Sequence, residues 1–450
     1  MVLYPMQSKY SLLIFLTLWW FVSQNSHAQT TSLPIPSKAE QLDDLFLALY
    51  NTNQFNGSVL VIEEGKVIYH RALGWANVAE RDTFQTYTPI RVASVSKQFT
   101  SMAVMMLKEA GKITYSDDVR MYLPELSFEG VTIKNLLEHS SGIPDYFAYD
   151  SDLSRRFNRT MNNQDLIDYF AKSKLLFKPG SQCQYSNTNY VYLATIVERI
   201  SGMPFDQFLK KNIFAPLHMS AFVYNTSTHT TVDTILVKAG TSARWDTLRQ
   251  GNKIEILQTT TQRYELKTRL LKRAIGYDPD PANGQWNVLD YNVYDGMMGE
   301  KDVCISTEDF IKWDEALHNH RLVSDASFAE AVTPYGVPSG EDYSFGRGWK
   351  IYNDRPHVSF HHGYYRGFRT YIQRNRGNCN TIVILSNRSI GRKIYDMYHC
   401  VENILAGEPY EVPEPKPWEK KFLDVFESQY KIQYEPLHTL PKVQLANDPR

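Results

Sequence analysis

The sequence is poor in cysteine, and the cysteines that it has show no metal-binding or redox spacing. Only 4 occur in 450 residues, namely Cys183, Cys304, Cys379 and Cys400. So few cannot form the disulfide framework of a small secreted domain, and the lack of a C-x-x-C pair argues against zinc and redox roles. One disulfide bridge is compatible with these positions, but their spacing does not fix its pairing.

The sequence also lacks an excess of positive or negative charge. The formal net charge is −1 and no long basic block occurs, so the sequence gives no electrostatic signature of nucleic-acid binding. Hydrophobic residues make up 43% and charged residues 22%, which is ordinary for a globular protein and excludes a disordered or fibrous chain.

The N-terminal region lacks a hydrophobic run long enough to cross a bilayer. Its apolar run extends from Leu12 to Val22, follows Lys9, and precedes the small-x-small stretch Ser26-His27-Ala28. This pattern predicts a cleaved signal peptide over 1–28 and an exported protein, periplasmic or secreted, without a stable membrane anchor. An uncleaved anchor is the alternative.

The remaining chain divides into a main domain over 29–410 and a tail. Pro413, Pro415 and Pro417 predict a Pro-rich linker that begins near residue 411 and leads to a short C-terminal appendage ending at 450. Within the main domain, residues 226–275 are polar, Thr-rich and without sustained periodicity. We therefore expect an irregular insertion there.

Strand signals lie at both ends of the main domain, with helical signals between them. Runs rich in Val, Ile and Leu predict a hairpin over 57–73 and strands over 358–363, 368–373 and 380–385. Residues from about 112 to 295 are mostly helical and loop-rich. These patterns predict an α/β (α+β) fold, in which an antiparallel sheet built from distant segments is flanked by helices and carries an inserted α-helical region.

The strongest candidate for chemistry is Ser94-Val-Ser-Lys97, followed by an apolar stripe that predicts a helix ending at Gly111. Residues three apart lie on one helix face, so the Ser94 hydroxyl and the Lys97 amine can come within hydrogen-bond reach. S-x-x-K alone is a weak signal, because Ser428 and Lys431 repeat it in the polar tail.

A serine hydroxyl needs a base, and Lys97 can act as one only if its amine is partly neutral. A tyrosine in contact with the amine could share its proton, and Tyr185 is the candidate; packing in the core is the other reading. Asn187 alone could cap the helix expected at 190–200. His361 and His362 are adjacent on a strand, face opposite sides and have no third ligand nearby, so we expect no metal and no cofactor.

Together these motifs resemble those of a known superfamily. Ser94-x-x-Lys97, Tyr185-x-Asn187 and His361-x-Gly363 occur in the order of the three active-site motifs of serine β-lactamases and penicillin-binding proteins. Side signatures such as Leu136 to Pro144 agree. The resemblance covers about residues 40–405 and points to the branch with class C β-lactamases, D-aminopeptidases, D-Ala-D-Ala carboxypeptidases and related esterases. It implies a β-lactamase/transpeptidase-like fold.

The resemblance also implies roles for individual residues. Ser94 would form an acyl-enzyme while Lys97 and Tyr185 exchange protons, and Asn187 would bind the substrate amide or the Lys97 amine. The backbone N–H groups of Ser94 and Tyr364 would form an oxyanion hole. Gly363 would leave room for substrate beside the strand. No Glu is identifiable as a separate base for deacylation.

One departure concerns the substrate. His362 stands where the family more often has Ser or Thr, whose hydroxyl helps to hold a substrate carboxylate. Arg366 is close enough in sequence to take over that contact. Alternatively, Tyr364, Tyr365 and Phe368 could form an apolar pocket for an ester or uncharged amide. The sequence thus predicts a serine hydrolase acting on a small molecule or peptide (a D-amino-acid peptide, a β-lactam or an ester). The alternative is a non-catalytic ligand-binding or sensor domain, and the sequence does not indicate the oligomeric state.

Overall fold

The computed structural model describes residues 36–225, 230–250, 253–280, 285–417, 419 and 432–437. Its main sheet has seven strands in the order β12-β13-β14-β15-β16-β1-β2, and each strand is antiparallel to its neighbours. The strands are β1 (Gly57–Glu63), β2 (Lys66–Leu73), β12 (Tyr343–Phe345), β13 (Lys350–Tyr352), β14 (Val358–Tyr365), β15 (Phe368–Asn375) and β16 (Asn380–Ser386).

The sheet joins the two ends of the main domain, as the sequence predicts. β1 pairs with β16 from Gly57↔Ser386 to Ile62↔Thr381. Val59 and Val61 belong to one hydrophobic cluster and Leu60 and Ile62 to another. Both faces of β1 are therefore buried, which explains its unbroken apolar sequence.

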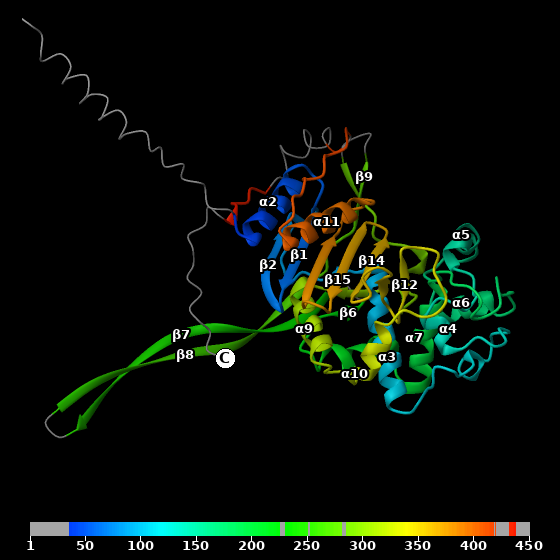
Figure 1. Cartoon of the computed structure of the whole chain (residues 1–450), viewed down its shortest axis with the longest axis horizontal. Coiled ribbons are helices and arrows are strands. Elements are labelled where there is room, and N and C mark those ends of the chain that lie inside the picture. Colours follow the sequence, from blue (N-terminus) through cyan, green and yellow to red (C-terminus); the bar gives the residue numbers. More distant parts are fainter. Residues whose placement is uncertain are drawn as a thin grey trace, which may run out of the picture. The chain divides into compact units, whose positions relative to one another are not determined.

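Helices cover both faces of the sheet (Figure 1). On one face, α2 (Lys38–Asn51) and α11 (Lys393–Ala406) share a core with Val59 and Val61. On the other face lie α3 (Lys97–Glu109) and α9 (Thr307–His318), which belong to the larger cluster. This three-layer arrangement confirms the predicted fold class. α3 is followed by Gly111 at φ 68°, the left-handed position expected of a residue that ends a helix.

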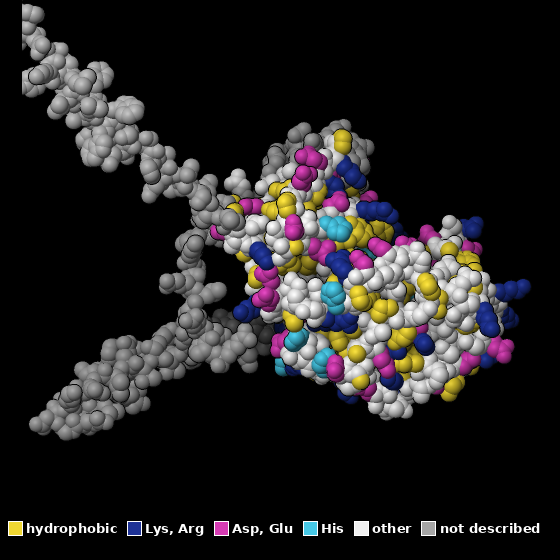
Figure 2. Space-filling view, viewed as in Figure 1, with side chains coloured by type: hydrophobic (Ala, Val, Ile, Leu, Met, Phe, Trp, Pro, Cys, Tyr) yellow, Lys and Arg dark blue, Asp and Glu magenta, His cyan; other side chains and the backbone are white. Residues whose placement is uncertain are grey.

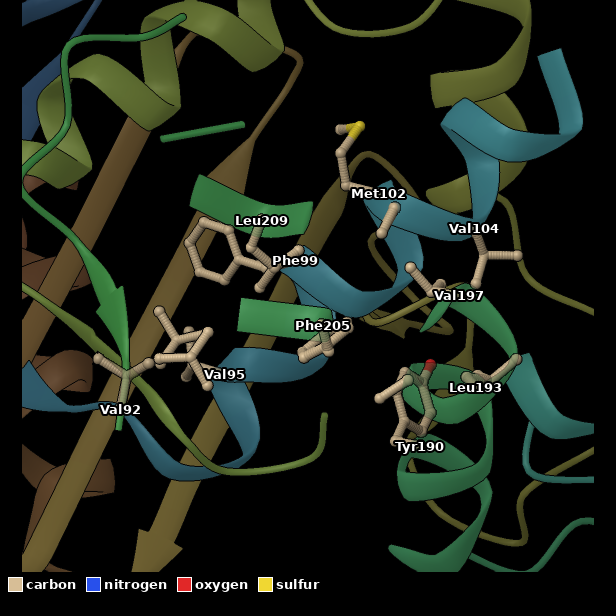
Figure 3. Close-up of a cluster of buried hydrophobic side chains, with 14 of the residues drawn as sticks. Val92, Val95, Phe99, Met102, Val104, Tyr190, Leu193, Val197, Phe205 and Leu209 are labelled. Atoms are coloured by element: carbon tan, nitrogen blue, oxygen red, sulfur yellow. The ribbon is translucent and has the colours of Figure 1, made fainter. Parts of the chain in front are cut away.

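The inserted helical region packs on α3. Figure 3 shows Val104 of α3 beside Val197 of α7, and Phe99 of α3 beside Leu209 of α8. The helices of this region are α4 (Ile133–Leu137), α5 (Asp150–Arg156), α6 (Asn163–Phe170), α7 (Thr188–Ser201) and α8 (Phe205–Leu209). The remaining elements are α10 (Asp325–Ala331), β3 (Trp75–Asn77), β4 (Asp82–Thr83), β5 (Ile90–Arg91), β6 (Phe222–Val223), β9 (Tyr277–Asp280), β10 (Gln285–Val288) and β11 (Val303–Ile305).

The prediction of an irregular insertion over 226–275 is wrong. β7 (Thr230–Gln250) and β8 (Lys253–Lys272) form a long antiparallel pair, from Thr230↔Lys272 to Gln250↔Lys253. Thr-rich sequence favours strands even where apolar and polar residues do not alternate regularly. The lack of sustained periodicity in 226–275 therefore did not indicate irregular structure.

The tail is attached to the main domain where the structure describes it. The Tyr50 hydroxyl accepts from Ile432 N (3.2 Å), Asp43 Oδ2 accepts from Leu437 N (2.8 Å), and both acceptors lie on α2. Lys393 forms a buried ion pair with Glu419. Described residues beyond the prolines, in the predicted short appendage, thus contribute contacts to the α2–α11 layer.

All four cysteines are free thiols, so none forms the bridge that the sequence left open. Across the residues that the structure describes, no helix has the length and apolarity to span a membrane. The predicted signal peptide, 1–28, lies outside those residues. On the face shown in Figure 2, acidic and basic side chains are interspersed.

Candidate active site

A pocket of about 730 Å³ lies where β14, the turn that carries Ser94 and the inserted helical region meet. Six of the nine residues predicted to form the site line it, namely Ser94, Tyr185, Asn187, His362, Tyr364 and Arg366. Lys97 and His361 each hydrogen-bond to a lining residue, Ser94 and His362 respectively. The pocket lining is Ser94, Phe147, Asp150, Tyr185, Asn187, Asp278, Leu289, Asn292, Glu300, Tyr343, Lys350, His362, Tyr364, Tyr365, Arg366 and Ser389.

Ser94 lies in a 3₁₀ turn, η1 (Ala93–Ser96), that leads directly into α3. Ala93 has φ 49°, a conformation that residues with a side chain seldom adopt and that often marks a functional turn. The first residue of α3 is Lys97, whose Nζ lies 3.1 Å from Ser94 Oγ. The predicted meeting of hydroxyl and amine is therefore present.

The Lys97 amine is fully buried and held by three hydrogen bonds. It donates to Asn187 Oδ1 at 2.8 Å, to the Glu300 carbonyl at 2.9 Å and to Ser94 Oγ at 3.1 Å. Burial lowers the pKa of Lys97 to about 8, against the opposing effect of the Glu300 charge. An amine with this pKa can lose its proton near neutral pH and accept one from a hydroxyl.

Tyr185 lies beside this pair. Its phenol is hydrogen-bonded to the Ser94 side chain, and burial holds its pKa well above the usual value of 10.0. Lys97 Nζ is 5.1 Å from the centre of its ring. Tyr185 is therefore a protonated phenol at neutral pH, suited to donate or relay a proton.

Asn187 is the residue before α7, yet its side chain makes no capping hydrogen bond. The amide instead accepts from Lys97 and donates to Asp145 Oδ2 at 2.9 Å. Of the alternatives raised for Asn187, the structure shows the contact with the Lys97 amine.

His361, His362 and Gly363 follow one another on β14. His361 is buried, and its Nδ1 donates to the His362 carbonyl at 2.8 Å, because a carbonyl can only accept. His362 faces the pocket. A side-chain carbon at Gly363 would lie 2.2 Å from both the Val92 carbonyl and Thr370 Oγ1. Glycine is thus required first for packing against the Ser94 turn, whereas the sequence suggested only room for substrate.

Two further residues lie near the catalytic candidates: His139, which the sequence assigned to loop structure, and Glu300, which the sequence did not indicate. His139 is buried at φ 57° and stacks on the Tyr185 ring with centroids 4.3 Å apart, so it fixes the ring that the sequence identified. Its place in the Leu136 to Pro144 signature was the available signal. Glu300 lines the pocket, and its Oε2 lies 3.5 Å from Lys97 Nζ.

Glu300 belongs to a buried charged network behind the pocket. Its Oε1 accepts from the Tyr146 hydroxyl at 2.6 Å and lies 3.2 Å from Lys301 Nζ. Lys301 also pairs with Asp302 at 3.2 Å. The network holds the Glu300 carboxylate in place, where it stabilises the charged form of Lys97.

Replacing Glu300 with Gln should move the acid limb of the pH profile of kcat/KM to lower pH, by about one unit or more. The change removes the largest influence that raises the pKa of Lys97, so the neutral amine forms at lower pH; Asp145 and Lys301 remain beside it. A pH series of hydrolysis rates measures the shift. Glu129→Gln, at an exposed position, is the control. An unchanged acid limb would show that Lys97 does not set it.

The site thus combines a serine hydroxyl, a buried lysine and a tyrosine at the junction of an antiparallel sheet and a helical region, the arrangement found in the class of serine acyl-transferases and hydrolases. The chain belongs to the beta-lactamase family, whose family model matches residues 42–396. Family and structural neighbours place it in the superfamily of serine β-lactamases and penicillin-binding proteins.

Individual relatives agree with this placement. The chain is 32% identical over 401 residues to penicillin-binding protein 4* of Bacillus subtilis (strain 168), covering 86% of this chain and 81% of the relative. A penicillin binding protein from Bacillus halodurans has a similar structure, with TM-score 0.63, 24% identity, and coverage of 80% of this chain and 98% of that one. D-amino acid amidase from Ochrobactrum anthropi SV3 shares the fold, with TM-score 0.62, 17% identity, and coverage of 82% and 98%.

Proposed function

We propose that the chain is an exported serine hydrolase that cleaves a small ester or amide through an acyl-serine intermediate on Ser94. The observation that carries this proposal is the 3.1 Å contact between Ser94 Oγ and the buried Lys97 amine, whose pKa is about 8. Peptidase or carboxypeptidase and esterase activities both fit such a site.

In the proposed mechanism, Ser94 Oγ attacks the substrate carbonyl carbon while its proton passes to Lys97 Nζ. The carbonyl oxygen becomes an oxyanion, which the backbone N–H groups of Ser94 and Tyr364 would stabilise. The bond to the leaving group then breaks, and Lys97 returns the proton to that group through the Tyr185 hydroxyl. The closeness of Gly363 to Val92, just before the Ser94 turn, supports the pairing of these two N–H groups.

Water then attacks the acyl ester, loses a proton to the same groups, and releases the acid and free Ser94. Two groups could direct this water: Tyr185, which contacts Ser94, and Glu300, whose carboxylate lines the pocket. The D-amino acid amidase among the structural neighbours makes amides of D-amino acids a substrate class to test. The proposed export is supported by the N-terminal sequence, with cleavage after Ala28.

Mass spectrometry of the intact protein and of its peptides, together with rate assays, tests the proposal. The protein is isolated after expression of the full chain and treated in parallel with a p-nitrophenyl ester, a chromogenic cephalosporin and a D-Ala-D-Ala peptide. We expect a mature chain that starts at Gln29, a transient acyl mass on the peptide containing Ser94, and turnover of at least one substrate. The adduct should be absent from Ser94→Ala.

Three outcomes would change the proposal. An adduct on another residue would mean that Ser94 is not the nucleophile. A stable adduct without turnover would favour the alternative, a ligand-binding or sensor domain that retains the pocket. A chain that keeps residues 1–28 would contradict the cleaved signal.

A further inference from the structure

The edge of β14 beside the pocket has room for another strand. β13 pairs with β14 only at Lys350↔Phe360 and Ile351↔Ser359. From His361 to Tyr365, β14 is paired on its other side with β15, and among the described strands it has no further neighbour. His362, Tyr364 and Tyr365 line the pocket along this free stretch.

An extended substrate can complete such an edge as an added strand. If it continues the antiparallel pattern of this sheet, it lies in line with β13, just before Lys350, and runs in the direction of β13. Its C-terminal side then points to Lys350. Its N-terminal side points to Arg366, in the turn at the far end of β14. His362 and Arg366 are four residues apart, which is roughly 13 Å along a strand.

Lys350 is an unusual residue for this position. Its side chain is only 4% exposed, yet it lines the pocket. Within the described parts of the chain, no hydrogen bond or ion pair to its ammonium group is found. The two other buried lysines near the pocket are partnered: Lys97 binds Asn187 (2.8 Å), and Lys301 pairs with Asp302 (3.2 Å).

Aromatic rings surround the Lys350 amine. Its Nζ lies 4.0 Å from the ring centre of Tyr343, 5.7 Å from that of Phe345 and 5.8 Å from that of Tyr185. Ring faces attract a cation but replace a hydrogen-bonded anion only in part. Burial lowers the pKa of Lys350 to about 7, although the charges of Glu341 and Asp342 act in the opposite direction.

His362 adds a second free polar atom to the same place. It lines the pocket beside Lys350, and its buried Nδ1 has no hydrogen-bond partner among the described residues. Lys350 and His362 thus both line the pocket, and each has a polar group without a hydrogen-bond partner among the described residues, which indicates a ligand that supplies the missing contacts.

We propose that Lys350 and His362 form a subsite for a negatively charged group on the leaving-group side of the substrate, with the C-terminal carboxylate of a peptide as its natural occupant. This inference rests on the proposed function, because the scissile carbonyl must lie at Ser94. The sequence suggested Arg366 as the partner of a substrate carboxylate, whereas this proposal assigns that role to Lys350 and His362 at the opposite end of the free β14 edge. It also explains how the site can bind a carboxylate without the Ser or Thr expected at position 362.

Binding to an inactive variant tests the subsite independently of turnover. N-acetyl-D-Ala-D-Ala and its C-terminal amide, which differ only in the terminal charge, are titrated calorimetrically against Ser94→Ala. The acid should bind about 10- to 100-fold more tightly than the amide, as expected for a hydrogen bond to a charged group. Adding Lys350→Met should reduce this preference to about threefold or less, while adding Lys350→Arg should retain most of it.

Turnover of a matched pair of esters provides the second measurement. N-acetyl-D-alanyl-D-lactate and its lactamide are compared by kcat/KM in the wild type, Lys350→Met and Arg366→Met. Lys350→Met should lower kcat/KM for the lactate far more than for the lactamide, and Arg366→Met should leave their ratio unchanged.

The outcomes separate the two proposals. Equal binding of acid and amide by Ser94→Ala, or a preference that survives Lys350→Met, would overturn the subsite. Equal loss of both esters in Lys350→Met would assign Lys350 a role in holding Tyr185, which also overturns it. A charge preference in binding, without turnover or an adduct on Ser94 in the wild type, would uphold the subsite and reject the hydrolase.

Discussion

Ser94→Ala, Lys97→Met and the double variant should lose activity by about the same factor, on the order of 10³-fold or more in kcat/KM. The reason is that the two residues act as one unit: the Ser94 hydroxyl is a weak nucleophile without a proton acceptor, and the Lys97 amine, 3.1 Å away, is the acceptor proposed for its proton. Removing either should therefore remove the whole contribution.

The measurement is steady-state hydrolysis of whichever substrate the wild type turns over, with the unfolding temperature of each variant followed in parallel. Lys97→Met removes one of the two lysine partners of the buried Glu300 carboxylate, which keeps Lys301 and Tyr146, so some loss of stability is expected. Lys108→Met, on the same helix but in a partly exposed pair with Glu330, is the matched control and should stay active. If the losses of Ser94→Ala and Lys97→Met multiplied in the double variant, the two residues would act independently, and Lys97 would not be the proton acceptor for Ser94.

The main features of the fold could be predicted because they depend on local signals. The strands expected at 57–63 and 66–73 coincide with β1 and β2, and the helix expected at 190–200 lies within α7. Continuous Val, Ile and Leu runs specify strands buried on both faces. The 226–275 segment lacks such runs. Its two strands form a long ribbon, and the sequence periodicity did not indicate them.

The site could be predicted only where residues are close in sequence or belong to a recognisable motif. Ser94 and Lys97 are one helical turn apart, so local geometry alone brings them together. Glu300 reaches Lys97 from a loop 203 residues further along the chain, and no local pattern indicates that contact. The sequence does not indicate Lys350 as a pocket residue either, because its place at the edge of β14 depends on where β13 stops pairing with β14.

Gly363 shows how the fold itself places the two proposed oxyanion donors. The Val92 carbonyl accepts from Thr370 Oγ1 at 2.7 Å, and the Val92 N–H donates to the Val303 carbonyl at 2.9 Å. Val92 is thus fixed by β15 and β11, two residues before Ser94. Gly363 lies against this fixed segment, so its lack of a side chain sets the separation between Ser94 and Tyr364.

Gly363→Ala should therefore lower kcat by about 10²-fold or more and destabilise the fold by about 1–3 kcal/mol. The added carbon would lie 2.2 Å from the Val92 carbonyl, so β14 must move away from the Ser94 turn and carry the Tyr364 N–H out of position. Gly336→Ala is the matched control, because a carbon there meets no atom within 4 Å. Hydrolysis rates and unfolding temperatures of the two variants check the expectation. Since only the proposed transition-state contact requires this spacing, kcat should fall much more than binding of N-acetyl-D-Ala-D-Ala weakens; equal losses in both would mean that the strand positions substrate rather than the oxyanion.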